Sequence, residues 1–330
     1  MPDNPQDQRI ELFDRSHIEG FPRFFRDGDD RRLFEAIKNQ ELIVFYGAGV
    51  SKLAGCAGWY ELACNVIQCF GSSVYSDLYK AVLRETAAVD ARKAISICAA
   101  RAKADPELEA AYYQAIRDSV KPQNEAAFID IHEQLCGLRP AAFITTNIDK
   151  GIERVPAEVF GARKVINLTT LDVDPIPDLR NGNIFYLHGS TDAIDKTVLT
   201  TDQYIEYYYN RPKPDLKNFL REVFIGKYSV LFLGYGLAEY EILQNIYLAA
   251  NGHDSAPREN RHFLLTPIFS RDVAKFNVET EYFRLFSVRA IPYFIDHEGY
   301  GRLNYVLREL RKEIQASAAT LDLMREIDSV

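Results

Sequence analysis

Short apolar runs alternate with segments of helical periodicity along most of this chain. Runs of three to seven mainly apolar residues predict buried strands at 42–46, 142–145, 164–168, 184–187, 230–233, 263–265 and 288–294. Helix-like spacing is found at residues 31–40, 149–155, 202–209, 215–225, 239–250, 271–276 and 301–327. Strands that are apolar on both faces and alternate with helices are typical of a parallel α/β sheet.

The stretch from about residue 60 to residue 138 has a different pattern. Apolar residues recur there at helical spacing, as in Ala94, Ile97 and Cys98, and no strand-like run interrupts them. We expect three to five helices that form an inserted subdomain. The predicted division is an N-terminal extension over residues 1–40, a main domain over residues 41–300 with the insertion at about 60–138, and C-terminal helices over residues 301–330.

Composition and charge narrow the class of protein. The 330 residues are 47% hydrophobic and 26% charged, which is globular composition and excludes a fibrous or disordered chain. The formal net charge of −8 lacks the basic footprint of a nucleic-acid binder, so we expect no direct nucleic-acid binding. No apolar run reaches about 18 residues, so no membrane span is expected.

The cysteines bear on metal binding and compartment. There are five, and no two of them form a C-x-x-C pair, so we expect neither a zinc ribbon nor another metal site. The first residues are mostly polar and do not resemble a signal peptide. A reducing, cytoplasmic location is therefore expected.

Two glycine-rich turns follow predicted strands. The first reads Gly47-Ala48-Gly49-Val50-Ser51, and Lys52 occupies the place of the third glycine of a G-x-G-x-x-G pattern. The second is Gly234-Tyr235-Gly236, with Glu239 close behind. Glycines at such points allow a tight turn and a close approach of the backbone to a pyrophosphate. The alternative for each is an ordinary turn without a ligand.

Polar side chains follow two further strands. Thr146, Asn147 and Asp149 come after one, and His188-Gly189 after the other. Ligands bind beyond the carboxyl ends of the strands in a doubly wound sheet, and histidine titrates near neutrality. Asn147 or Asp149 could instead cap the next helix, and His188 could be a structural residue bonded to a loop carbonyl.

The order of these segments resembles the sirtuin superfamily, and more closely its sirtuin-like branch in bacterial antiphage defence. That branch shows G-A-G-x-S, G-W-x-x-L, T-T-N-x-D, L-H-G and then a glycine-rich turn near an acidic residue. The matching segments here are residues 47–51, 58–62, 145–149, 187–189 and 234–239. The resemblance extends over about residues 40–295.

The resemblance implies a Rossmann-like sheet that binds NAD and cleaves the bond between nicotinamide and ribose. Asn147 would contact the nicotinamide ribose or position the attacking water, Asp149 would help to hold the carboxamide, and His188 would be the general base, with a pKa near about 6–7. The residues expected around the remainder of NAD are Gly47, Ala48, Gly49, Ser51, Thr146, Gly234, Tyr235, Gly236 and Glu239.

The chain departs from the protein deacetylases of this family. It lacks their four zinc-binding cysteines and carries the helical insertion instead, which favours water over an acetyl-lysine peptide as the acceptor. We therefore expect an NAD+ glycohydrolase, with cyclisation left open. Trp59 could pack on the ligand or in the core, and we expect the core. The alternatives are a non-catalytic NAD or ADP-ribose binding scaffold, and a zinc-free deacylase or ADP-ribosyltransferase.

An effector that depletes NAD must be held inactive. The resemblance implies control by a partner in trans, such as a DNA-translocase-type ATPase, an Argonaute-type protein or a sensor, together with self-assembly into a homo-oligomer. The chain contains no P-loop of its own.

Overall fold

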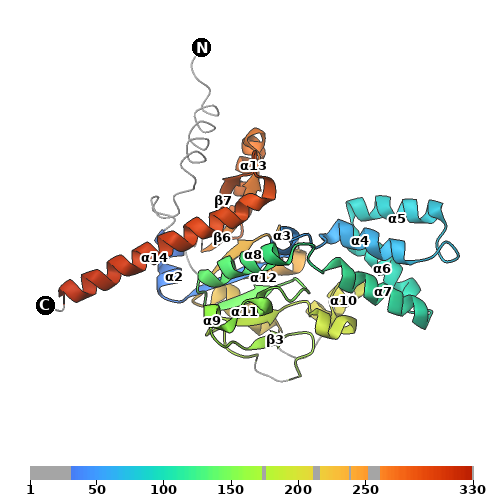
Figure 1. The fold of residues 1–330 in the computed structure, drawn as a ribbon, viewed down its shortest axis with the longest axis horizontal. Helices are drawn as coiled ribbons and strands as arrows, with labels where there is room; N and C mark the ends of the chain where they lie inside the picture. Colours follow the sequence, from blue (N-terminus) through green and yellow to red (C-terminus); the bar gives the residue numbers. More distant parts are fainter. Residues whose placement is uncertain (1–30, 173–175, 211–215, 238, 252–260, 329–330) are drawn as a thin grey trace, which may run out of the picture.

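The fold is an α/β sandwich built on one parallel sheet. The computed structural model describes residues 31–172, 176–210, 216–237, 239–251 and 261–328. Seven strands pair side by side, all in parallel, in the order β3-β4-β2-β1-β5-β6-β7 (Figure 1). The predicted Rossmann-like parallel sheet with an inserted helical subdomain is thereby confirmed.

The strand positions agree closely with the apolar runs of the sequence. The strands are β1 (Leu42–Tyr46), β2 (Ala142–Thr145), β3 (Val165–Asn167), β4 (Asn183–Tyr186), β5 (Ser229–Leu233), β6 (His262–Ile268) and β7 (Val288–Phe294). After β1 the chain builds the sheet toward β3, and it then crosses to place β5 on the other side of β1. The switch point, where doubly wound sheets bind their ligands, therefore lies between β1 and β5.

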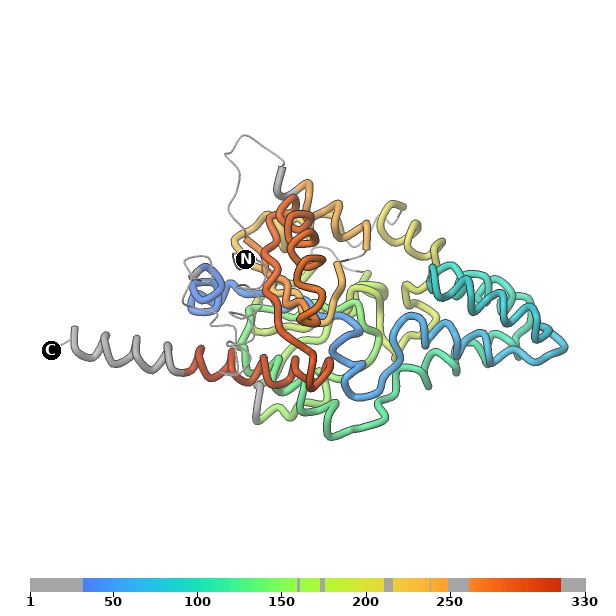
Figure 2. The backbone as a smooth tube through the Cα atoms, turned by 90° about the horizontal axis from the view of Figure 1, so that it is seen from above, coloured from blue at the N-terminus to red at the C-terminus, as the bar shows by residue number. Residues whose placement is uncertain are grey.

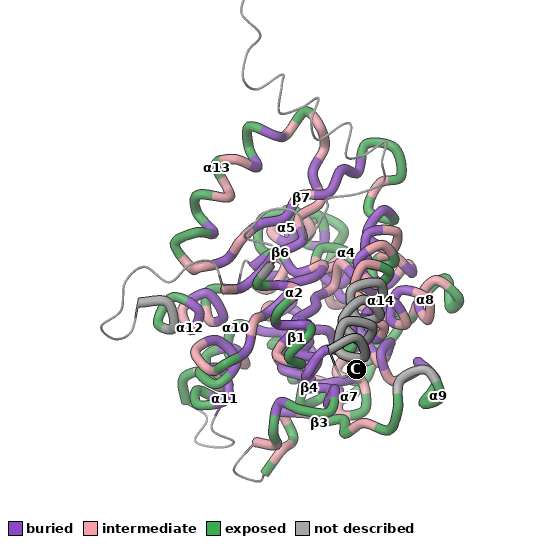
Figure 3. The backbone as a smooth tube through the Cα atoms, turned by 90° about the vertical axis from the view of Figure 1, so that its left-hand side faces the viewer, coloured by how far each residue is buried: buried purple, intermediate pink, exposed green. Residues whose placement is uncertain are grey.

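Alternate residues of the strands enter two separate cores. Ile43 and Phe45 of β1 belong to one core, whereas Leu42, Val44 and Tyr46 belong to the other. The first core is covered by α11 (Leu216–Ile225), α12 (Tyr240–Asn251) and α13 (Val273–Arg284). The second is covered by α2 (Arg31–Lys38), α8 (Glu125–Gly137) and α14 (Arg302–Asp328). Figure 3 shows the buried strands between the two helical layers.

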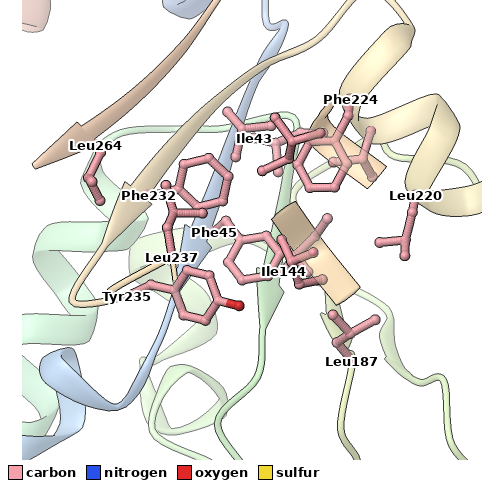
Figure 4. Close-up of a cluster of buried hydrophobic side chains, with 14 of the residues drawn as sticks. Ile43, Phe45, Ile144, Leu187, Leu220, Phe224, Phe232, Tyr235, Leu237 and Leu264 are labelled. Atoms are coloured by element: carbon pink, nitrogen blue, oxygen red, sulfur yellow. The ribbon is translucent and has the colours of Figure 1, made fainter. Parts of the chain in front are cut away.

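The first core reaches the end of the sheet where the site lies. Figure 4 shows Phe45 of β1 and Phe232 of β5 beside Tyr235, which follows β5. The ring centroids of Phe45 and Tyr235 are 4.9 Å apart, and those of Phe232 and Tyr235 are 6.1 Å apart. Aromatic packing thus fixes the start of the loop that follows β5.

Four helices of the insertion form a bundle with its own core. They are α4 (Trp59–Cys69), α5 (Asp77–Val89), α6 (Ala91–Ala102) and α7 (Pro106–Ser119). They project from one end of the molecule (Figures 1 and 2). Their core residues include Val66, Ile67, Phe70, Leu83, Ile95 and Ile116. Since α8 packs on the sheet, we infer that the inserted unit is α4–α7.

Local sequence explains where these helices begin. The side chains of Ser76, Asp90 and Asp105 accept hydrogen bonds from backbone amides in the first turns of α5, α6 and α7. Each bond satisfies an amide that has no partner within its helix. Pro106 occupies the first position of α7, where no amide hydrogen is needed.

The remaining elements are short. They are α3 (Ala48–Lys52), α9 (Ala157–Phe160), α10 (Thr201–Ile205), a π-helical turn η3 (Glu206–Asn210), and the 3₁₀ turns η1 (Ile152–Arg154), η2 (Thr191–Lys196), η4 (Ser270–Asp272) and η5 (Gly299–Gly301). Within the described residues, no helix is long and apolar enough to cross a bilayer.

The prediction of a helix at residues 149–155 is wrong, because only the 3₁₀ turn η1 forms in that segment. The Asp149 carboxylate accepts a hydrogen bond of 3.0 Å from the amide of Gly151, and Pro156 follows directly after the segment. An Asx turn at one end and a proline after the other leave no room for an α-helix.

Candidate functional site

The four predicted segments meet at one edge of the sheet, because all of its strands point the same way. The loop after β1 is bonded directly to the loop after β5. The amide of Gly47 donates to the carbonyl of Leu233 at 3.0 Å, and the amide of Gly49 donates to that of Gly234 at 2.8 Å. The two glycine-rich turns therefore form one structure across the switch point.

The glycines of these turns are needed for packing between the loops. A Cβ atom on Gly49 would lie 2.8 Å from the Cα atom of Gly234, closer than real Cβ contacts. Gly234 itself has a φ of +55°, in the region that favours glycine. The structure thus gives these glycines a reason beyond the expected approach of a pyrophosphate.

A buried polar network joins the ends of β1 and β2. Ser51 Oγ donates to Asp149 Oδ2 at 2.7 Å, and Asn147 Nδ2 lies 3.0 Å from Ser51 Oγ and 3.1 Å from the carbonyl of Gly47. The three side chains are between 2% and 7% exposed. Both amide hydrogens of Asn147 are thereby used, which leaves its carboxamide oxygen as the atom suited to accept a hydrogen bond from a ligand.

A cavity of about 300 Å³ opens beside this network. The predicted site residues on its wall are Ala48, Ser51, Thr146, Asn147, Asp149, Gly234, Tyr235, Gly236 and Glu239. Gly47, Gly49 and His188 are not on the wall. The volume lies at the lower end of the range for small-molecule sites.

Most of the remaining wall comes from the helical insertion and its connections, with Ile148 from the loop after β2 and Leu199 from before α10. None of these wall residues except Trp59 was considered as a ligand contact from the sequence: Cys56, Ala57, Gly58, Leu62, Val120, Ile148 and Leu199. Trp59, expected in the core, lies partly buried against two hydrophobic cores and also lines the cavity. The G-W-x-x-L segment was the signal that could have placed this wall at the site.

An ion pair connects the first glycine-rich turn to this wall. Lys52, at the end of α3, lies 2.7 Å from the carboxylate of Glu61 in the first turn of α4. The pair is about half exposed, so it contributes little stability. The ion pair places the start of α4 beside the first glycine-rich turn.

His188 follows β4 but lies behind the cavity wall. Its side chain is 1% exposed. Nε2 lies 2.8 Å from the hydroxyl of Tyr208, and Nδ1 lies 3.3 Å from that of Tyr204. Burial, helped by the charge of Arg92, lowers the pKa of His188 to about 3. The imidazole is therefore neutral, and the expected pKa near 6–7 does not hold in this conformation.

Glu239 is the acidic neighbour of His188. Its Oε2 atom lies 3.7 Å from His188 Nε2, and the residue is 7% exposed on the cavity wall. Within the described part of the chain, Oε2 has no hydrogen-bond partner. Burial raises the pKa of Glu239 to about 7, although Arg92 and the hydroxyl of Tyr235 favour the charged form. Both of its protonation states are therefore accessible near neutral pH.

A second cavity of about 320 Å³ lies beyond the loop that follows β5. It shares Gly234, Tyr235 and Gly236 with the first cavity, and its other walls include β6 and β7. Thr266 Oγ1, on its wall, is a buried hydroxyl with no hydrogen-bond partner among the described residues. The two cavities thus flank the second glycine-rich turn.

The described residues contain no group of three or more His, Cys, Asp or Glu side chains arranged to hold a metal ion. The five cysteines are all free thiols, and burial raises the pKa of Cys56 on the cavity wall to about 12. The polar chemistry described at this edge therefore comes from amides, hydroxyls, carboxylates and one imidazole.

Two comparisons with known proteins both find similarity to sirtuin-like proteins. Residues 141–285, from the start of the β2 region to the end of α13, match a family model described as SIR2-like domain. The chain is also 25% identical over 218 residues to Defense-associated sirtuin 2 of Bacillus subtilis. That match covers 64% of this chain and 19% of the relative, so the chain spans about a fifth of the length of that curated protein. Residues 141–285 thus match a SIR2-like domain, and the resemblance of this chain to the sirtuin-like proteins of bacterial defence is confirmed.

Proposed function

We propose that this protein hydrolyses NAD+ at the bond between nicotinamide and ribose, and that it serves antiphage defence by depleting NAD when activated. The observation that carries the proposal is the cavity at the switch point, where the Asn147 network and Glu239 face the same space. The SIR2-like domain and the similarity to a defence-associated sirtuin support NAD as the substrate.

The two cavities have a layout that suits a dinucleotide. A dinucleotide crosses the switch point of a doubly wound sheet with its pyrophosphate at the glycine-rich turn. The nicotinamide half would occupy the cavity at Asn147, and the adenosine half would occupy the cavity beside β6. A Cβ atom added at Gly236 would meet nothing within 4 Å, so this stretch of backbone is open to a ligand. Glu239 lines the first cavity and Thr266 lines the second, so a carboxylate residue and a hydroxyl residue lie along this path.

The residues of the first cavity suit bond cleavage at the ribose. Nicotinamide leaves C1′ with the bonding electron pair, and positive charge develops on the ribose ring. The carboxamide oxygen of Asn147 is held in place by two hydrogen bonds on Nδ2, so it is preorganised toward that charge or toward an attacking water. Trp59, Leu62 and Val120 supply apolar walls that limit the entry of bulk water.

Asp149 is better suited to positioning than to direct contact with the carboxamide. Its two carboxylate oxygens accept hydrogen bonds from Ser51 Oγ and from the amide of Gly151. In these roles it fixes Ser51, which in turn fixes Asn147. The role expected for Asp149 from the family stays a prediction.

The burial of His188 favours one alternative, a non-catalytic module that binds NAD or ADP-ribose. A base that is 1% exposed and bonded to Tyr208 cannot reach a substrate in this conformation. If the protein is catalytic, a regulatory partner or self-assembly, both still predictions, would be needed to expose His188 to the substrate. Solution mass with and without candidate partners tests that requirement, and a strict monomer in both samples would contradict it.

The test is product analysis with purified protein, with and without the partner. Incubation with NAD+ is followed by chromatography for nicotinamide, ADP-ribose and cyclic ADP-ribose. Nicotinamide and ADP-ribose in equal amounts support hydrolysis, and the cyclic product would redirect the assignment to cyclisation. Binding of ADP-ribose without any nicotinamide release under all conditions would support the binding module instead.

A further inference from the structure

Another cavity, of about 680 Å³, lies at the edge of the sheet opposite the candidate NAD+ site. Its walls are formed by residues that stand just before β1, β2, β3, β4 and β5, and by α14. Because all strands are parallel, their amino ends gather at this edge, whereas doubly wound folds bind their usual ligands at the carboxyl ends. The cavity is therefore separate from the candidate NAD+ site.

The wall of this cavity is strongly basic. Its cationic side chains are Arg139, Arg163, Arg180, Lys227 and Arg311. Among the described residues that line it, none is an aspartate or a glutamate. The chain as a whole has 47 acidic and 39 basic residues. The cavity thus concentrates positive charge within an acidic protein, and a hollow with charge of one sign attracts ligands of the opposite sign.

Only part of this charge is neutralised by ion pairs. Arg180 lies 3.7 Å from the carboxylate of Asp178, and Lys227 lies 3.6 Å from that of Glu41. Both pairs are largely exposed, so they are weak. Within the described part of the chain, Arg311 and Arg139 form no ion pair. Their guanidinium groups are therefore available to an anion.

Three residues of the wall have a backbone conformation that favours glycine. The φ angle is +56° at Gln40, +49° at Arg139 and +58° at Asn181. Five non-glycine residues of the described chain have a positive φ, so three of those five line this cavity. Gln40 and Arg139 stand just after α2 and α8, where glycine is the usual residue. An arginine at such a position is less stable than glycine, which supports a function for its side chain.

Two glycines let arginine side chains lie against the wall. A Cβ atom on Gly182 would lie 2.5 Å from Nη1 of Arg163, and one on Gly137 would lie 2.6 Å from Cδ of Arg311. Burial lowers the pKa of Arg163 to about 10, so its guanidinium stays protonated at neutral pH although it is partly removed from water. The backbone thus places two of the cations before any ligand binds.

We propose that this cavity binds a small ligand that carries a chain of two or more phosphate groups. A terminal phosphate carries about two negative charges and three acceptor oxygens, and the arginine fork binds it through two parallel hydrogen bonds. The five cations come from five different elements, so a ligand with several phosphates can contact more of them than a single phosphate can. The volume lies within the range for small-molecule sites. The net charge of −8 disfavours a nucleic-acid strand.

The experiment is titration calorimetry of the full chain with inorganic tripolyphosphate, without Mg²⁺ and at about 0.15 M salt. We expect saturable binding at one site with a Kd below about 100 µM. A rise to about 0.5 M salt should weaken the binding, because it screens the charges. The affinity for ATP then distinguishes two sources of the phosphate chain. Binding at least about tenfold tighter than that of tripolyphosphate indicates a nucleotide, and equal or weaker binding indicates a bare polyphosphate.

Two variants assign the binding to this cavity. Arg311→Gln and Arg139→Gly should each weaken tripolyphosphate binding at least about tenfold, the effect of one lost charge-assisted hydrogen bond. Arg308→Gln, one turn earlier on α14, is the matched control, because Arg308 pairs with Asp130 at 2.7 Å and does not line the cavity. It should stay within about threefold of wild type. Arg139→Gly should not lower the temperature of unfolding, since glycine tolerates the φ angle at this position.

Three results would overturn the proposal. The first is no saturable binding of tripolyphosphate up to about 1 mM, including the case in which only DNA binds. The second is an equal loss of affinity in Arg308→Gln and Arg311→Gln. The third is a loss in Asn147→Ala but not in Arg311→Gln, which would place the phosphates at the switch point. None of these results bears on NAD+ cleavage, because the proposal goes beyond that function and does not depend on it.

Discussion

Ser51 donates a hydrogen bond of 2.7 Å to Asp149, although 98 positions separate them in the chain. Ser51 comes from the glycine-rich turn after β1, and Asp149 comes from the loop after β2. The bond also connects a residue outside the SIR2-like match to one within it. The candidate site is therefore assembled by parallel pairing of β1 with β2, which places the ends of both strands together.

Replacement of Ser51 by alanine should destabilise the fold. The change leaves Asp149 Oδ2 and Asn147 Nδ2 buried without their partner, and each such loss costs about 1–3 kcal/mol. We expect a decrease of about 2 kcal/mol in the free energy of unfolding, measured with urea. Ser73→Ala, at an exposed position, is the control and should change it by less than about 0.5 kcal/mol. Equal effects of the two changes would argue against the network.

Two glycines of the paired turns should respond differently to alanine. The new methyl group of Gly49→Ala would press on the backbone of Gly234, and we expect a loss of about 1–3 kcal/mol. The methyl group of Gly236→Ala would meet no atom within 4 Å, so stability should stay unchanged or rise by up to about 1 kcal/mol. Thermal unfolding of both variants measures the contrast. A stable Gly49→Ala variant would mean that the two turns are not in contact.

Trp59 provides an intrinsic signal for ligand binding. It is the single tryptophan of the chain, and it lines the first cavity. Occupation of the cavity by ADP-ribose or nicotinamide should change its emission in a saturable way. In Asn147→Ala the same titration should require more ligand. Saturable binding by calorimetry with no change in Trp59 emission would place the ligand elsewhere.

The pKa of Glu239 predicts a specific dependence of stability on pH. Its carboxyl group titrates near 4.5 when unfolded and at about 7 when folded. Between these values the folded state holds a proton that the unfolded state has released, so stability falls as pH rises through this window. The loss should be about 3 kcal/mol and nearly complete above about pH 7.

Glu239→Gln removes that loss, because glutamine cannot ionise. The free energy of unfolding of the variant, minus that of wild type, should therefore increase as pH rises from 4.5 to 8. Burial lowers the pKa values of His188 and His262 to about 3. Because the unfolded protein binds these protons more readily, the folded state loses stability as pH falls below about 6.5. Their effect is present in both proteins and cancels in the difference. A difference that is constant with pH would contradict the raised pKa of Glu239.

Most of the sheet could be predicted from the sequence, and much of the site could not. The strand β1 is a continuous apolar run and β7 is a mainly apolar one, so the first and last residues of both strands were predicted correctly. The placement of Asn147 and Asp149 beside Ser51 followed from the parallel order of strands, which sequence periodicity indicates. Such predictions depend on local pattern and on one rule of topology.

The relation between His188 and Glu239 depends on tertiary packing. It requires α10 and η3 to fold over the end of β4, which covers the imidazole with Tyr204 and Tyr208. Motif matching identified both His188 and Glu239 but treated them as separate contacts to NAD. The position of Trp59 could not be predicted from the sequence either, because it depends on how the helical insertion packs against the sheet.

The most direct test of the account is the rate of nicotinamide release from NAD+ by wild type, Asn147→Ala and the exposed control Asn39→Ala. We predict release by wild type and by Asn39→Ala at rates within about twofold, and a loss of at least about 100-fold in Asn147→Ala. Undiminished release by a folded Asn147→Ala variant would show that the cavity between β1, β2 and β5 is not where NAD+ is cleaved.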